Sequence, residues 1–222
     1  MDFAPFWLSF RLASVTTLIL LPLGIGLVCL IRLLPHWARP WWQSVVSLPL
    51  VLPPSVLGYY LLVSFSPTAW LGQWAEAWGL PLAFSFTGLV VGSVIFSLPF
   101  MVNPIVSAIE SLPPVYEAAA YSLGKGPLAT FFRVLLPNVK QSVLTGAVMA
   151  FAHTVGEFGV VLMIGGNIPE QTRTASIAIY HEVEMLQYEH ADRYALILLV
   201  FSFVVLSFVY GLEAYLRKRR EL

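Results

Sequence analysis

The sequence predicts an all-α membrane protein that crosses the bilayer about five times. Its 222 residues are 58% hydrophobic and only 11% charged, which is far too apolar for a soluble domain of ordinary composition. The apolar residues also gather in segments long enough to cross a hydrocarbon core, which takes about 20 residues at a rise of about 1.5 Å each. No low-complexity run or polar linker divides the chain, so we expect residues 1–222 to form a single transmembrane domain.

Five apolar segments follow one another along the chain. They cover approximately residues 12–31, 45–65, 84–106, 143–164 and 194–216. The first could be taken for a secretory signal, but the stretch from Met1 to Phe10 has no basic residue and no small-residue cleavage site follows the apolar run. We therefore expect an uncleaved first helix.

Basic residues are unevenly divided between the two sides of this arrangement. With five spans, the connections at 32–43 and 110–141 share a side with the C-terminal tail. That side holds nine of the twelve Lys and Arg residues, namely Arg32, Arg39, Lys125, Arg133, Lys140, Arg217, Lys218, Arg219 and Arg220. Because cytoplasmic loops carry the excess of Lys and Arg, the sequence predicts an external N-terminus, a cytoplasmic 110–141 loop and a cytoplasmic C-terminus.

Composition also excludes several classes of function. The formal net charge of zero leaves no basic surface for nucleic acid. Cys29 is the single cysteine, so neither a disulfide framework nor a thiolate metal site can form within one chain. The chain lacks the Gly-x-x-x-x-Gly-Lys-Ser/Thr loop that cradles phosphates in ATPases. We expect a protein that is not itself an enzyme and holds no cofactor or metal of its own.

Prolines occur in the second and third spans, in the third as Pro99 and Pro104. The second places Pro49, Pro53 and Pro54 in mid-membrane, and each removes a backbone hydrogen-bond donor. A carbonyl freed in this way persists in hydrocarbon only where protein or water covers it. Two interpretations stay open: a pore-lining or gate segment at Pro53 and Pro54, or a kinked helix that only packs. In the third span, Asn103 needs hydrogen-bond partners or a position near the wet end of the helix.

The fourth span contains ionisable side chains. His153 and Glu157 are four residues apart, which would place them on one face of a continuous helix, with Gly156 beside Glu157. A charge near mid-bilayer costs at least about 3 kcal/mol, so these side chains must face a partner or water. Either they belong to a gate or dimer interface, or they bond each other and tie helices together. Two ligands without a third disfavour a metal site.

The stretch EAAAYSLGKGPLATFFRVLLP, from Glu117 to Pro137, contains the most specific motif. The alanines after Glu117 favour a short helix, and Gly124 supplies a left-handed or close-contact position. Gly126 precedes a proline that can start a second helix, which we expect over about 128–136, with Pro137 at its end.

This pattern resembles the cytoplasmic coupling loop of ABC importer permeases. The matching positions are Glu117, Ala119, Ala120, Gly124, Val134, Leu136 and Pro137. The resemblance implies the type I importer permease fold. It also implies that the loop docks in a groove of a separate ATPase subunit, which uses ATP and Mg, and passes that subunit's closure to the membrane helices.

The run HTVGEFGVVLMIGGNIPEQTRTASIAIY, residues 153–180, is similar to the matching region of molybdate permeases, as is the proline-rich second span. Glu170-Gln171 departs from the Gly-Glu expected there. The resemblance implies import of molybdate through a homodimer in the bacterial inner membrane, served by two cytoplasmic ATPase subunits and one external binding protein. We expect the external face with Asn167 and Arg173 to receive that binding protein.

Other functions stay open at this point. Tungstate is nearly the same size and charge as molybdate, and sulfate or thiosulfate permeases share the outline of the motif. A membrane anchor that recruits a cytoplasmic enzyme would also explain the loop, but it would leave the broken and polar spans without a purpose. No Lys or Arg occupies the centre of a predicted span, so we expect selectivity to lie mainly in the external protein.

Overall fold

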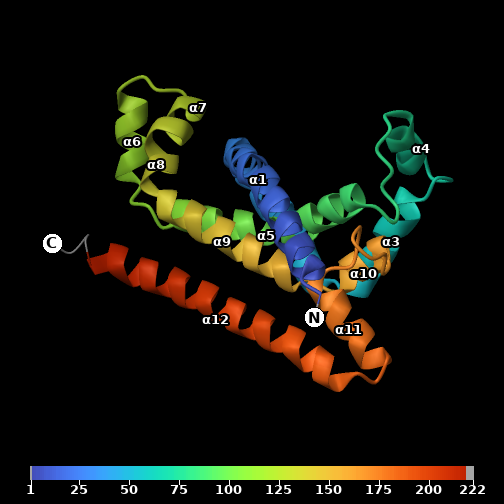
Figure 1. Cartoon of the computed structure of the whole chain (residues 1–222). Coiled ribbons are helices and arrows are strands. Elements are labelled where there is room, and N and C mark those ends of the chain that lie inside the picture. Colours follow the sequence, from blue (N-terminus) through green and yellow to red (C-terminus); the bar gives the residue numbers. More distant parts are fainter. Residues whose placement is uncertain (1, 219–222) are drawn as a thin grey trace.

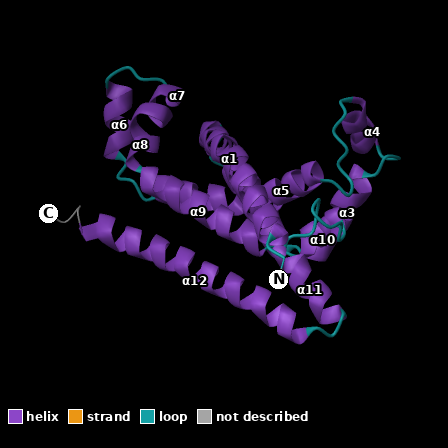
Figure 2. Ribbon diagram, viewed as in Figure 1, coloured by secondary structure: helices purple, strands orange, loops and turns teal. Residues whose placement is uncertain are grey.

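The structure is a computed structural model that describes residues 2–218, with the side chains of residues 2–211. All regular secondary structure in this part of the chain is helical (Figure 2). By length and composition, three helices could each cross a membrane: α1 (Ala4–Leu33), α5 (Phe86–Glu110) and α12 (Tyr188–Lys218), the last over Tyr188–Gly211. Arg219 and Arg220, which we counted for the orientation, lie outside the described residues.

The remaining apolar segments form broken helices. α2 (Arg39–Val51) and α3 (Pro54–Phe65) meet at 104° around Leu52 and Pro53, because Pro53 and Pro54 interrupt the helical hydrogen bonds. α9 (Lys140–Gly156) is bent by 75° from the helical segment 127–138 that precedes it. If each bent pair is one span, the structure has up to five spans, which is the predicted number, although the second pair begins at residue 127 and ends at Gly156 and so differs from the predicted span 143–164.

Shorter helices fill the connections. α4 (Trp70–Ala77) joins α3 to α5, and α11 (Ala175–Glu184) joins α10 (Gly159–Gly165) to α12. The loop after α5 forms α6 (Val115–Ser122), α7 (Pro127–Thr130), a π-helical turn η1 (Phe131–Leu135) and α8 (Leu136–Asn138). Figure 1 shows α6 to α8 at one end of the bundle and α4 near the other.

Pro137 does not end its helix, so that prediction was wrong. It lies in the first turn of α8, where a proline is tolerated because the missing N–H has no intrahelical partner there. The preceding π-helical turn widens the backbone before the proline. Asn138 follows, and its Nδ2 donates to the carbonyl of Val134 at 2.7 Å.

The core lies where α1, α5 and α9 pack against one another. One buried cluster includes Leu12, Leu89 and Val161, and a second includes Leu20 and Met101. Fully buried hydroxyls occupy the helix turns between these clusters, at Thr16, Ser93, Ser97 and Thr154. α12 packs along α11 and α9, with most of its surface outside the bundle (Figure 1). These four residues form a polar layer within an otherwise apolar core, which also contains a third buried cluster around Phe96 and Val160.

Candidate functional site: a coupling segment and two broken spans

The candidate coupling segment, residues 115–138, begins with the short helix that its alanines predict. α6 ends at Ser122, and Gly124 then adopts φ +72°, the left-handed conformation that favours glycine. Nothing lies within 4 Å of the position that a Cβ on Gly124 would take. Glycine is therefore required here by the backbone conformation and not by a close neighbour.

The motif positions divide between the inside and the outside of this segment. Ala120 is buried and Ala119 is exposed, while Val134 and Leu136 are half-buried and Pro137 is exposed. Large apolar side chains also face outward, including Val115, Tyr121, Leu123, Leu128 and Phe132. Leu123 is 77% exposed, which is unusual for a leucine in a folded segment. The segment thus presents an apolar surface that nothing else in the described chain covers.

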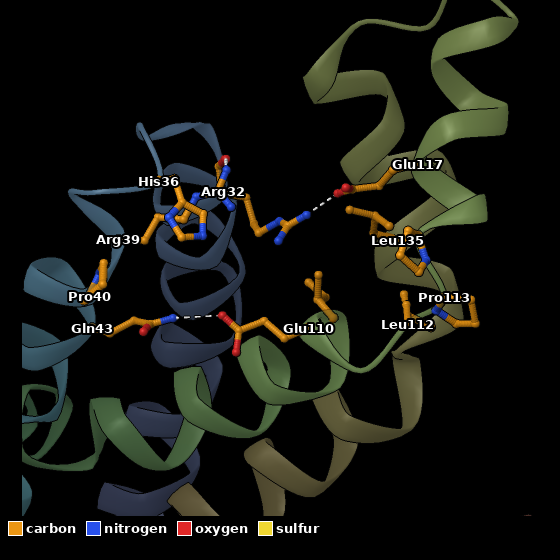
Figure 3. Close-up of a pocket in the computed structure, with 12 residues that line it drawn as sticks. Arg32, His36, Arg39, Pro40, Gln43, Glu110, Leu112, Pro113, Glu117 and Leu135 are labelled. Carbon is orange, nitrogen blue, oxygen red and sulfur yellow. Dashed lines mark hydrogen bonds and ion pairs between the residues drawn. The ribbon is translucent and has the colours of Figure 1, made fainter.

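Glu117 forms an ion pair with Arg32, the basic residue in the last turn of α1 (Figure 3). The two side chains are 32% and 21% exposed. Beside them is a cavity of about 380 Å³ that lies between the end of α1, the start of α2, the end of α5 and the coupling segment. The ion pair joins the coupling segment directly to the first membrane span.

Arg32 was not predicted as a partner of Glu117 and entered only the prediction of the orientation. The two residues are 85 positions apart, and no local motif connects them. Arg39, which was counted in the same way, donates from its guanidinium to the carbonyls of Leu34 at 3.1 Å and Arg32 at 2.9 Å. It thereby satisfies carbonyls that the end of α1 leaves free.

Glu157 lies at a break in the fourth span, so the prediction that it shares a helix face with His153 was wrong. α9 ends at Gly156, and Glu157 has extended dihedral angles (φ −66°, ψ 137°) before α10 begins at Gly159. No proline causes this break. The flanking glycines permit it, since glycine is a poor helix former.

The Glu157 carboxyl is 5% exposed. Its Oε2 accepts a hydrogen bond from Ser93 Oγ on α5 at 3.1 Å, and its backbone carbonyl accepts one from Ser176 on α11. Its Oε1 is buried without a hydrogen-bond partner among the described residues. Glu157 therefore links three helices through hydroxyls and not through an ion pair.

His153 belongs to the same polar layer but bonds a different serine. Its Nδ1 lies 3.0 Å from Ser97 Oγ, and its ring lies against Phe96 and Phe100, with centroids 4.9 and 4.1 Å away. Ser97 Oγ in turn lies 2.9 Å from Thr154 Oγ1. The alternative in which His153 and Glu157 bond each other is replaced by two separate serine contacts to α5.

The breaks of the second and fourth spans meet each other. A Cβ on Gly159, the first residue of α10, would lie 2.6 Å from the Cβ of Pro54, the first residue of α3. One turn further along α3, a Cβ on Gly58 would lie 2.7 Å from the Cβ of Met163. α3 and α10 therefore pack closely as a pair of half-helices, and glycine is needed on both sides.

The other candidate residues take different positions. Asn103 is half-buried, and its Oδ1 accepts a hydrogen bond from Ser47 Oγ on α2 at 3.3 Å. Gly156 is exposed, and no described residue lies within 4 Å of the position that a Cβ on it would take. Arg173 Nε donates to Asn167 Oδ1 at 2.5 Å, so these two residues form one structural unit in the loop between α10 and α11. That loop lies at the end of the bundle away from α6 to α8 (Figure 1).

The long apolar helices and the exposed apolar side chains on them define a helical membrane protein. The chain belongs to the family described as binding-protein-dependent transport system inner membrane component, whose model matches residues 20–221. It is therefore an ABC transporter permease of the inner membrane, as the sequence predicted.

Relatives with an established name indicate which kinds of ABC permease this chain resembles. The chain is 45% identical over 211 residues to the molybdenum transport system permease protein ModB of Azotobacter vinelandii, covering 95% of this chain and 93% of that protein. It is 38% identical to the protein of the same name from Escherichia coli (strain K12), over 78% and 76% of the two chains. It is 34% identical to the sulfate transport system permease protein CysT of Synechocystis sp., over 79% of this chain and 62% of that one.

Solved structures confirm the fold. The structure superposes on a chain of a bacterial alginate ABC transporter, in complex with its alginate pentasaccharide-bound periplasmic protein, with a TM-score of 0.73 at 19% identity. The match covers 93% of this chain and 76% of the other. An amino acid ABC transporter matches with a TM-score of 0.64 at 18% identity, over 93% and 90% of the two chains. The all-α permease fold of ABC importers is thus confirmed, while the orientation in the membrane stays a prediction.

Proposed function

We propose that this chain is the membrane permease subunit of an ATP-driven molybdate importer and that two copies form the translocation path. The observation that carries the proposal is the 45% identity to a molybdenum permease along nearly the whole length of both chains. Identity to the Synechocystis sulfate permease is 34% and spans 62% of that longer protein. Two cytoplasmic ATPase subunits, which use ATP and Mg, and one external molybdate-binding protein would complete the transporter.

In this proposal the coupling segment receives force from the ATPase. Its exposed apolar side chains supply a docking surface, and the Gly124 corner sets the angle between α6 and α7. The ion pair between Glu117 and Arg32 would carry movement of α6 into α1, and the bend at residue 139 would carry movement of α8 into α9. Closure of the ATPase would thereby shift the spans between two arrangements.

The gate in this proposal is the pair of half-helices α3 and α10 with the polar layer beside them. Pro53 and Pro54 free backbone groups at one break, and Gly156 leaves the other break open on its exposed side. Glu157 and His153 hold α9 to α5 through hydroxyls, which exchange partners at low cost compared with ion pairs. Asn103 adds a side-chain amide in the cytoplasmic half of the third span.

The external partner would meet the loop that contains Asn167 and Arg173. The bond between these residues holds the loop, and Thr172 reinforces it by donating to the carbonyl of Gly165 at 2.7 Å. The loop therefore offers a pre-formed surface to a binding protein. In this arrangement the pore supplies hydroxyls and amides, and the external protein supplies selectivity.

Reconstitution tests the proposal and its competitors. The chain would be placed in liposomes with its ATPase and with the binding protein loaded with molybdate, tungstate, sulfate or thiosulfate. We expect molybdate-loaded protein to stimulate ATP hydrolysis and anion uptake. Stimulation by sulfate or thiosulfate alone would reassign the cargo, for which the similarity to sulfate permeases is the supporting observation. ATPase binding without stimulation by any of the anions would favour the membrane anchor.

A further inference from the structure

The cavity beside the Arg32–Glu117 ion pair lies at the level where two spans end. α1 ends at Leu33 and α5 ends at Glu110, and both are long and apolar enough to cross a membrane. The cavity lies between these two ends, the first residues of α2 and the coupling segment, which contributes Glu117 and Leu135. Because apolar spans leave the hydrocarbon core near their ends, we place the cavity close to the membrane surface, whichever way the chain is oriented. Its volume of about 380 Å³ is at the small end of the range for ligand pockets, about 300–1,000 Å³.

The walls of the cavity carry charges of both signs (Figure 3). Arg32 and Glu117 neutralise each other. Arg39 uses two guanidinium N–H groups on backbone carbonyls, and since a guanidinium has five, about three remain. His36, from the connection between α1 and α2, is exposed beside it. One side of the cavity can therefore donate several hydrogen bonds to an anion.

An acceptor faces the cavity from α5. Glu110 Oε1 accepts a hydrogen bond from Gln43 Nε2 at 3.2 Å. A carboxylate has about four acceptor positions, so most of its capacity remains open. An isolated phosphate would meet this negative charge, whereas a ligand with a cationic amine next to its phosphate would satisfy both walls. The charges of the cavity complement a zwitterion.

Three exposed tryptophans lie on the same segment of the chain as two residues of the cavity. Trp37 and Trp41 are 75% and 72% exposed, and Trp42 is 44% exposed. All three lie on the connection and first turn of α2 that also supply His36 and Arg39. Tryptophan is enriched at membrane–water interfaces because its ring is apolar and its N–H is polar. These tryptophans do not line the cavity, but they favour a position of this end of the bundle in the headgroup layer.

We infer that this cavity binds the headgroup of phosphatidylethanolamine. Arg39 and His36 would hold the phosphate, and Glu110 would accept hydrogen bonds from the primary ammonium. Phosphatidylcholine has the same charges, but its quaternary ammonium has no N–H to donate. Phosphatidylglycerol has no cation for Glu110. The site is a property of this chain and does not depend on which anion is transported.

Native mass spectrometry of the purified transporter measures this preference. The protein would be titrated with lipids of identical acyl chains, in which the amine bears zero, one, two or three methyl groups, and with phosphatidylglycerol. We expect retention to fall stepwise with methylation and to be about tenfold lower for the trimethylated lipid, as loss of a charge-assisted hydrogen bond predicts. Equal retention across the methylation series, or stronger retention of phosphatidylglycerol, would overturn the inference.

The variant Glu110→Gln tests the same contact from the protein side. Its amide keeps a hydrogen-bond acceptor but loses the charge, so we expect its preference for the ethanolamine lipid over the choline lipid to fall several-fold. Glu76→Gln, on exposed α4, removes one acid elsewhere and is expected to keep the wild-type preference. A Glu110→Gln transporter with the full wild-type preference along the methylation series would disprove the role of Glu110. The methylation series on the unmodified protein decides the question if this variant does not fold.

Discussion

Glu117 and Glu157 are both glutamates, but their carboxyl groups lie in different surroundings and have different partners. Glu117, at the end of the bundle, is 32% exposed and pairs with Arg32. Glu157, in the buried polar layer, is 5% exposed and bonds Ser93. The first is in contact with water, so its charge costs little and can join two segments. The second is surrounded by protein, where an unpaired acceptor is costly.

This contrast shows where rigidity and movement are located. The coupling segment has exposed apolar side chains and a partly exposed ion pair, whose strength depends on solvent. Both features suit a surface that binds a partner and responds to it. The half-helices α3 and α10 are held by direct glycine contacts with no space between them. Because packing of that density leaves no free space, a movement of one half-helix must displace the other.

The largest effect is expected where the two breaks touch. Replacing Gly159 with alanine places a Cβ 2.6 Å from the Cβ of Pro54, so one of the half-helices must move. Such overpacking costs about 1–3 kcal/mol, and we expect at least a tenfold loss of uptake in reconstituted vesicles. Gly26→Ala is the control, because nothing lies within 4 Å of its Cβ and alanine favours the α1 helix. Normal uptake by Gly159→Ala would show that the contact does not constrain transport.

A second test separates conformation from space in the coupling segment. Gly124 and Gly126 both have open surroundings, but Gly124 has φ +72° and Gly126 has φ −71°. Valine at 124 would cost about 1–2 kcal/mol in the left-handed region, while valine at 126 fits its extended backbone. We expect Gly124→Val to insert into the membrane but to lose about tenfold in uptake and in stimulated ATPase activity.

Gly126→Val is expected to retain most of the uptake in the same assay. Equal losses in the two valine variants would mean that the outer surface of the corner, and not its backbone angle, contacts the ATPase. Equal retention would remove Gly124 from the coupling mechanism.

Substitutions of Glu157 test the polar layer, and we expect them to have an effect of intermediate size on uptake. Glu157→Gln keeps an acceptor for Ser93 but removes the capacity to be charged, whereas Glu157→Ala leaves Ser93 without this partner. We expect alanine to lower uptake by about tenfold and glutamine by a few-fold, since an unsatisfied buried group costs about 1–3 kcal/mol. Uptake and basal ATPase activity of the assembled transporter are the measurements. If neither changes in either variant, Glu157 has no part in a gate.

Local chemistry made much of this fold predictable. The apolar segments, the break at Pro53 and Pro54 and the left-handed Gly124 follow from hydropathy and from the backbone limits of single residues. The break at Glu157 was missed because glycines permit a helix break without enforcing one, and the deciding contacts come from α5 and α11. Tertiary contacts overrode local preference there.

The ion pair between Arg32 and Glu117 could not be predicted for a related reason. Each residue had a sufficient local explanation, Arg32 as a cytoplasmic charge and Glu117 as the first position of a motif. Their proximity depends on how α1 and the coupling segment pack, across 85 residues of sequence. Long-range pairs of this kind require the folded structure.

The same pair gives the smallest expected effect. A partly exposed ion pair contributes about 0.2–1 kcal/mol, so we expect Arg32→Glu or Glu117→Arg alone to lower uptake only a few-fold, by placing like charges together. The double exchange restores opposite charges and should recover uptake to within about twofold of the unmodified transporter. A link between α1 and α6 predicts this recovery, because only their mutual contact is rebuilt. A Glu117 that acts mainly on the ATPase predicts the reverse: the double variant would transport no better than Glu117→Arg, and the connection from α6 to the membrane would have to run through the bend into α9.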